Sequence, residues 1–104
     1  METLTRLEAT IAERRKADPK SSYVAQLSHR GTPVMARKLG EEAVEACVAA
    51  LSGSREELVG EAADVIFHLM VLLADKGVSL EEVMAELDRR EGVSGLDEKA
   101  SRST

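Results

Sequence analysis

The sequence has almost no aromatic residues. Its 104 residues include no tryptophan, one tyrosine (Tyr23) and one phenylalanine (Phe67). A core without large rings must be built from leucine, valine, isoleucine, methionine and alanine, the usual filling of contacts between helices. Strand-like alternation is also missing, whereas apolar residues recur at helical spacing through most of the chain. We therefore expect an all-α fold, and the length fits one domain.

Cysteine is equally scarce. Cys47 is the only one, so no internal disulfide can form. Its apolar neighbours Val44, Val48 and Leu51 predict a small buried side chain and not a reactive thiol, since no basic cluster surrounds it. The first residues show no secretory signal pattern, and a reducing compartment fits a single thiol. The expected location is the cytoplasm.

Positive charge is in deficit, with a formal net charge of -5 at pH 7. General binding to nucleic acid needs a basic face, so we expect no nucleic-acid partner. No apolar run approaches the roughly 18–20 residues that a membrane span needs, so we expect no membrane partner either.

Apolar periodicity and capping signals predict about five helices. Thr32 as the N-cap and Pro33 at the first helical position predict a helix start, and Ser54 and Ser79 each precede a glutamate at the spacing of a capping box. No apolar period continues into residues 92–104, which we expect to form a flexible tail after a helical domain at residues 1–91. The expected helices span about residues 2–15, 23–30, 32–51, 55–76 and 80–90.

Two pairs of acids organise the sequence. Glu42 and Glu45 lie three residues apart, as do Glu61 and Asp64, and residues at that spacing share one face of a helix. A breaker at Gly53 separates the two helices. If they fold back as an antiparallel hairpin, Glu45 lies opposite Glu61 and Glu42 opposite Asp64. Four converging carboxylates cannot all stay ionised without a positive partner.

The residues around these four acids indicate which positively charged partner they bind. The chain has no cluster of cysteine and histidine, so we expect no structural zinc site. All-oxygen ligation favours Mg²⁺, with Mn²⁺ as an alternative. In the same hairpin Lys38 lies opposite His68, and Arg37 is next to Lys38. A magnesium site beside cations suits a polyphosphate substrate. His68 is either a core histidine bonded to a carboxylate or a substrate contact.

The second helix of this hairpin is apolar on every side from Val65 to Ala74, interrupted only by His68. Such a helix is expected to be buried on all sides. A chain of this size has few helices with which to surround it. We therefore expect a homodimer, in which helices of both chains complete the bundle.

The acid motif resembles that of the all-α nucleoside triphosphate pyrophosphohydrolases, the MazG-like and dimeric dUTPase-like proteins. Within this superfamily the chain is most similar to the phosphoribosyl-ATP pyrophosphatases of histidine biosynthesis, over about residues 4–90. The resemblance is carried by Asp18-Pro19-x-Ser21-Ser22-Tyr23, by Arg37-Lys38-Leu39-Gly40-Glu41-Glu42-x-x-Glu45 and by Glu61-Ala62-Ala63-Asp64-x-x-x-His68.

This resemblance implies an enzyme that hydrolyses the α–β phosphoanhydride of phosphoribosyl-ATP, giving phosphoribosyl-AMP and pyrophosphate. It implies Glu42, Glu45, Glu61 and Asp64 as the metal ligands, and one of these acids or Glu41 as the group that orients the attacking water. The candidates for catalysis are thus Glu41, Glu42 and Lys38. Candidates for binding the substrate are the cations and polar residues nearby, namely Arg14, Arg15, Lys16, Ser22, Tyr23, Arg37, Lys38 and His68.

Two other functions stay open from the sequence. One is a house-cleaning pyrophosphohydrolase that removes noncanonical nucleoside triphosphates. The other is a helical dimerisation module without catalytic activity, whose acids are merely solvated.

Overall fold

The computed structural model describes residues 2–102, apart from the side chain of Glu98, and this part of the chain is all-α as predicted. Between the helices there are only short turns and one longer loop, at residues 15–22. The described helices are α1 (Glu2–Arg14), α2 (Tyr23–Arg30), α3 (Thr32–Ser52), α4 (Arg55–Asp75), α5 (Leu80–Arg90) and α6 (Gly95–Ser101).

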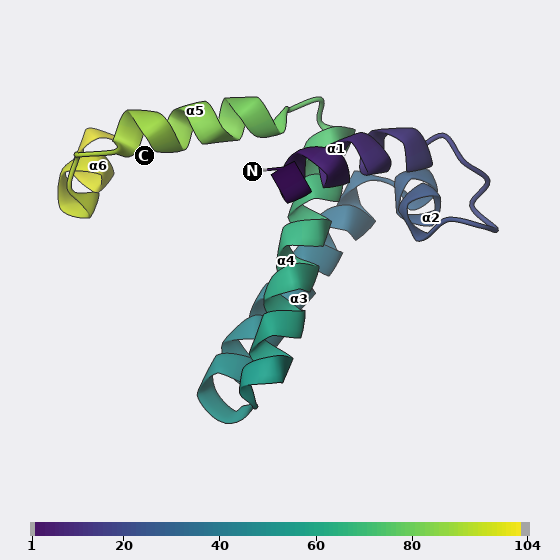
Figure 1. The fold of residues 1–104 in the computed structure, drawn as a ribbon, viewed down its shortest axis with the longest axis horizontal. Helices are drawn as coiled ribbons and strands as arrows, with labels where there is room; N and C mark the ends of the chain where they lie inside the picture. Colours follow the sequence, from purple (N-terminus) through teal and green to yellow (C-terminus); the bar gives the residue numbers. More distant parts are fainter. Residues whose placement is uncertain (1, 103–104) are drawn as a thin grey trace.

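The centre of the fold is the antiparallel hairpin of α3 and α4, which pack along their length (Figure 1). The return is tight at Gly53, where an added Cβ would lie 3.0 Å from the carbonyl oxygen of Ala49. Ser54 then begins α4 with the predicted capping box: its hydroxyl accepts from the backbone N–H of Glu57, whose carboxylate accepts from the Ser54 N–H. The sequence-based prediction of a central hairpin is confirmed.

Helices α1 and α2 cross the end of the hairpin that lies away from Gly53 (Figure 1). Gly31 makes the sharp change of direction between α2 and α3 with a φ of 98°, a conformation that favours glycine. The main core lies at this end of the molecule. Its buried side chains are Ile11, Val24, Leu27, Met35, Met70, Val71 and Leu80.

Arg15 joins the ends of three helices in this region. Its guanidinium donates to the carbonyl oxygen of Ala74 at 3.1 Å and lies 3.6 Å from the carboxylate of Asp75, at the end of α4. The hydroxyl of Thr32 donates to the other oxygen of Asp75. The prediction that Thr32 caps α3 is therefore wrong, because its side chain is drawn to Asp75 and the N-cap position falls to Gly31.

We expect Asp75→Ala to lower the free energy of unfolding by about 1–3 kcal/mol, because Thr32 and Arg15 both lose a partly buried acceptor. Urea unfolding followed by circular dichroism measures this change. Asp88→Ala is the matched control, since Asp88 is exposed near the end of α5, and it should change the stability by less than about 0.5 kcal/mol. Equal effects of the two substitutions would contradict the role of Asp75.

Helix α5 leaves this core as an arm, with α6 at its end (Figure 1). Ser79 forms the second predicted capping box, and the carboxylate of Glu8 on α1 accepts from the backbone N–H of Leu80 at 2.7 Å. Within residues 92–104, predicted as a flexible tail, the described residues Gly95–Ser101 form one more helix than expected. The flexibility of this segment stays a prediction.

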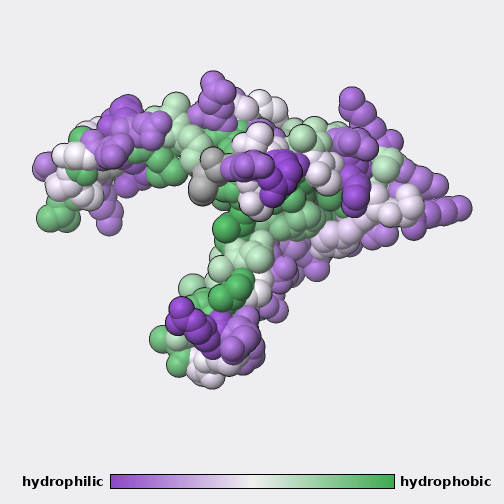
Figure 2. All heavy atoms as spheres, viewed as in Figure 1, coloured by the Kyte–Doolittle hydropathy of each residue, from purple (hydrophilic) through white to green (hydrophobic). Residues whose placement is uncertain are grey.

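One face of α4, opposite the acids, lies open in the single chain. Its apolar side chains recur at helical spacing, and Val59 and Ile66 are 64% and 43% exposed. Figure 2 shows apolar side chains along the hairpin and on the underside of the arm. The expectation that a second chain buries this face of α4 stays a prediction. The predicted burial of Cys47 on α3 is wrong for this chain, where Cys47 is exposed. The open face of α4 is formed by Leu58, Val59, Ala62, Ile66 and Leu69.

No helix among residues 2–102 combines the length and the apolar character needed to cross a membrane.

Candidate functional site

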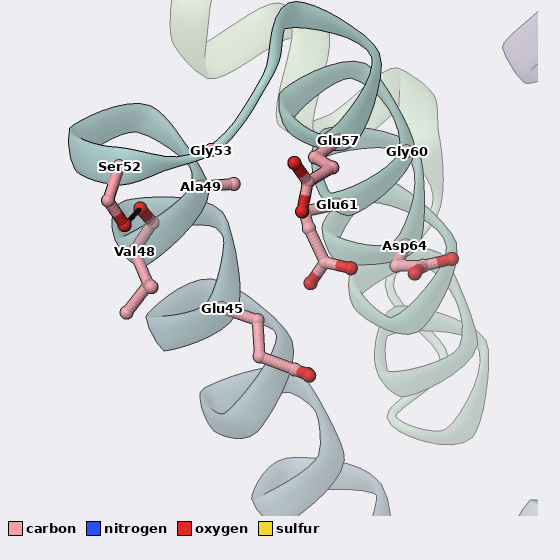
Figure 3. Close-up of a pocket in the computed structure, with 9 residues that line it drawn as sticks. All are labelled: Glu45, Val48, Ala49, Ser52, Gly53, Glu57, Gly60, Glu61 and Asp64. Atoms are coloured by element: carbon pink, nitrogen blue, oxygen red, sulfur yellow. Dashed lines mark hydrogen bonds between the residues drawn. The ribbon is translucent and has the colours of Figure 1, made fainter.

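Three of the predicted metal ligands meet between α3 and α4. One carboxylate oxygen from each of Glu42, Glu45 and Glu61 lies within 4.8 Å of the other two. The hairpin brings them together because Glu42 and Glu45 lie one turn apart on α3, while Glu61 approaches from the antiparallel α4. Beside them is a pocket of about 560 Å³ near the hairpin turn (Figure 3). We call these three residues the acid cluster.

The fourth predicted ligand, Asp64, lines the same pocket but is not part of this cluster. In Figure 3 its carboxylate points away from those of Glu45 and Glu61. It is nevertheless close enough to raise the pKa values of Glu42 and Glu61 by its negative charge. The structure thus brings together three of the four predicted acids, and places the fourth at the rim.

Negative charges repel one another in the acid cluster. Burial and then the negative charge of Glu45 raise the pKa of Glu42, and the same two causes raise the pKa of Glu61. One carboxylate oxygen of Glu61 is buried without any hydrogen-bond partner. A buried acceptor without a donor is costly, and a hard divalent cation with oxygen ligands would satisfy it. The donor set therefore fits Mg²⁺ or Mn²⁺.

Removing the charge of Glu61 should affect the stability of the protein in opposite ways without and with the metal. Because the folded state raises the pKa of Glu61, this group favours folding at low pH, and its contribution is lost as the pH rises through the raised pKa. We expect Glu61→Gln to unfold at or above the wild-type temperature in EDTA at pH 7, with a difference that shrinks as the pH falls. With Mg²⁺ the variant should gain less stability than the wild type.

Thermal unfolding across pH, in EDTA and in Mg²⁺, measures both effects. Glu82→Gln is a control of opposite sign, because hydrogen bonds from Ser79 lower the pKa of Glu82, so its contribution is present near neutral pH and lost as the pH falls. If Glu61→Gln destabilised the metal-free protein as Glu82→Gln does, the acid cluster would not be a site of charge repulsion.

Two cations of α3, Arg37 and Lys38, are paired with Glu41. The ammonium of Lys38 and the guanidinium of Arg37 each lie 3.7 Å from a Glu41 carboxylate oxygen. Glu41 is thus placed between two cations, outside the acid cluster. Lys38, whose side chain is 32% exposed, lies one helical turn before Glu42, which is the arrangement the sequence predicts.

The N-terminal candidates are placed less favourably. Arg15 is bound to Ala74 and Asp75, about 15 Å along α4 from Asp64 at 1.5 Å per residue. Ser22 is buried as the N-cap of α2, where its hydroxyl accepts from the backbone N–H of Ala25. The structure does not bring either side chain to the acid cluster. Two more candidates from this segment, Arg14 and Lys16, are exposed.

Tyr23 and His68 form a pair beside the cluster. The Tyr23 hydroxyl lies 3.2 Å from Nε2 of His68, and Nδ1 of His68 lies 2.9 Å from the backbone carbonyl of Asp64. The Tyr23 ring stacks on Phe67, with ring centroids 6.1 Å apart. Of the two alternatives for His68, the bond to an acid side chain is wrong, because its partners are the backbone carbonyl of Asp64 and the Tyr23 hydroxyl. The role as a substrate contact stays a prediction.

The sequence analysis missed several residues that line the pocket. Glu57 and Gly60 lie four residues before Glu61 and Asp64, so the helical period that identified the acids could have found them. Ser52 and Val48 line the pocket from α3. Nothing in the sequence indicated that these two residues line a pocket, because serine and valine are ordinary residues near the end of a helix.

Comparison with known proteins agrees with the pattern of acids. Residues 4–91 match the sequence profile of the family described as Phosphoribosyl-ATP pyrophosphohydrolase. The Phosphoribosyl-ATP pyrophosphatase of Erythrobacter litoralis is 71% identical over 102 residues, which cover 98% of each chain. The proteins of the same name from Novosphingobium aromaticivorans and Zymomonas mobilis are 65% and 61% identical, over 98% and 97% of this chain and 95% and 94% of theirs. The chain therefore belongs to the phosphoribosyl-ATP pyrophosphohydrolase family.

Proposed function

We propose that this protein hydrolyses the α–β phosphoanhydride of phosphoribosyl-ATP, releasing phosphoribosyl-AMP and pyrophosphate in the second step of histidine biosynthesis. The acid cluster carries this proposal, because three carboxylates and an unpartnered buried oxygen of Glu61 lie in a chain of this family. The enzyme acts with Mg²⁺, or with Mn²⁺ in its place, as a cytoplasmic homodimer.

Glu42, Glu45 and Glu61 would hold the metal, and Asp64, at the rim of the same pocket, would be a fourth ligand. Bound there, the metal would polarise the phosphoryl oxygens and offset their negative charge. Lys38, and Arg37 beside it, offset the charge that develops on the leaving pyrophosphate. Both cations pair with Glu41, and Lys38 lies one helical turn before Glu42.

The attacking water needs a carboxylate that orients it and draws on its proton. Of the two candidates, Glu42 lies within the acid cluster, whereas Glu41 is paired with two cations. We therefore propose that Glu42 orients the attacking water and that Glu41 positions Lys38 and Arg37.

Dimerisation is supported by the open face of α4. Exposed apolar side chains over three turns of one helix are typical of a protein interface. In a symmetric dimer the same face of both chains meets itself, and two hairpins side by side complete a four-helix bundle.

The test is pyrophosphate release from phosphoribosyl-ATP with Mg²⁺, beside a panel of plain nucleoside and deoxynucleoside triphosphates at equal concentration. We expect turnover of phosphoribosyl-ATP to exceed that of every plain nucleotide. Strong turnover of a deoxynucleoside triphosphate with none of phosphoribosyl-ATP would instead assign a house-cleaning activity. No turnover and no stabilisation by Mg²⁺ would leave a helical dimerisation module.

A further inference from the structure

The pocket beside the acid cluster is lined by acids and by no cation. None of its nine lining residues is a lysine, an arginine or a histidine (Figure 3). Four of them are acids, namely Glu45, Glu57, Glu61 and Asp64. Carboxylates repel the oxygens of a phosphate, whereas they accept hydrogen bonds from the hydroxyls of a sugar. The pocket therefore suits an uncharged, hydroxyl-rich part of a ligand better than a phosphate.

Two cations of α3 precede the acid cluster along the helix. Arg37 and Lys38 lie five and four residues before Glu42, about 6–8 Å away along the axis at 1.5 Å per residue. The pocket extends in the opposite direction, from Glu45 to the turn at Gly53. Along the hairpin the order is thus cations, acid cluster and pocket.

A substrate that is cleaved between its α and β phosphates has unlike groups on the two sides of the bond. One side is the leaving pyrophosphate, which carries several negative charges. The other side is the ribose that bears the α phosphate, which is uncharged and carries hydroxyls. With the bond at the acid cluster, the cations attract the pyrophosphate, and the carboxylates of the pocket accept from the ribose.

Gly60 is an independent reason to expect a ligand in this pocket. It lies in the interior of α4, where glycine is a poor helix former. A Cβ added at Gly60 would meet no atom within 4 Å, so packing within the chain does not require a glycine. Gly60 lines the pocket, and glycine is the residue that allows a ligand to approach the backbone closely.

We propose that the pocket between the acid cluster and Gly53 holds the ribose next to the α phosphate, and that the pyrophosphate lies on the side of Lys38 and Arg37. Gly60 is then a specificity-determining residue that leaves room for the sugar. This inference rests on the proposed function and adds the direction in which the substrate lies along the hairpin.

The experiment measures the binding of the two products to the full-length protein with Mg²⁺ by titration calorimetry. Phosphoribosyl-AMP carries the ribose, and pyrophosphate does not. Gly60→Leu places a side chain in the pocket and should weaken phosphoribosyl-AMP binding by about tenfold or more, while pyrophosphate binding stays unchanged. Equal losses for the two products, no loss for either, or a loss for pyrophosphate alone overturns the proposal.

Gly40→Leu is the matched control. Gly40 is a glycine in the interior of α3, an added Cβ there would also meet no atom within 4 Å, and it lies outside this pocket. Both substitutions should raise the unfolding temperature, because leucine is a better helix former than glycine. Only Gly60→Leu should weaken phosphoribosyl-AMP binding. An equal loss of affinity in Gly40→Leu would mean that the helices and not the pocket cause the effect, which contradicts the proposal.

These measurements are separate from the test of the proposed function, because product binding needs no turnover. In the kinetics, Gly60→Leu should raise KM for phosphoribosyl-ATP by a larger factor than it lowers kcat. If the wild-type protein released no pyrophosphate from phosphoribosyl-ATP, the proposed function would fail. The direction of binding would still stand or fall with the affinities of Gly60→Leu for the two products.

Discussion

Glu45→Gln is expected to lower kcat/KM for phosphoribosyl-ATP by about 100-fold or more, since even residues that only support metal ligands cost about 10- to 100-fold when replaced. Glu45 is the acid that the others depend on most, because its charge raises the pKa values of both Glu42 and Glu61. Glutamine keeps the size of the side chain and removes only the charge. The fold should therefore survive, and the loss should lie in metal binding and in the chemical step.

The measurement is pyrophosphate release over a range of Mg²⁺ concentrations. If Glu45 is a ligand, part of the activity should return at high Mg²⁺, because the remaining carboxylates still bind the ion more weakly. Glu56→Gln is the matched control: it removes one exposed glutamate in the first turn of α4, outside the pocket, and should keep nearly full activity. A Glu45→Gln variant with the activity of the control would show that the metal assignment is wrong.

The site could be predicted this far because helical periodicity determines which residues share a face. The return at Gly53 places Glu45 opposite Glu61, and the structure brings these two side chains together with that of Glu42. Side-chain direction is a different matter. Asp64 has the right height on α4, but its carboxylate points away from the cluster (Figure 3), and spacing along the sequence carries no information on such rotations.

Contacts between distant segments were harder to predict than the helices. Arg15 was assigned to the substrate because it is one of three consecutive cations, and nothing local reveals that Asp75 and Ala74 hold it at the end of α4. Thr32 precedes a proline, as a capping residue often does, yet its hydroxyl donates to the carboxylate of Asp75 instead of capping the helix. In both cases a partner far along the sequence outweighs the local signal.

The second large effect is expected at the open face of α4, where Ile66→Glu should dissociate the proposed dimer. In one chain Ile66 is 43% exposed, so a charge at this position costs the isolated chain little. At the centre of a self-complementary interface the same charge is buried without a partner, and such a charge costs about 3–5 kcal/mol. Two-fold symmetry places it in the interface twice. Each 1.4 kcal/mol is about tenfold in the dissociation constant, so the dimer should be lost at micromolar concentration.

Sedimentation equilibrium of the wild type and of Ile66→Glu measures the loss of the dimer, and circular dichroism measures the helix content. Leu96→Glu is the control, because Leu96 on α6 is 82% exposed and apolar but lies outside the open face of α4. It should keep the wild-type mass. We expect Ile66→Glu to give either a helical monomer or a chain that unfolds without its partner. Unfolding is possible because a helix that is apolar on every side is stable only when it is buried. An Ile66→Glu protein that stays dimeric would mean that α4 faces solvent and that the chains meet elsewhere.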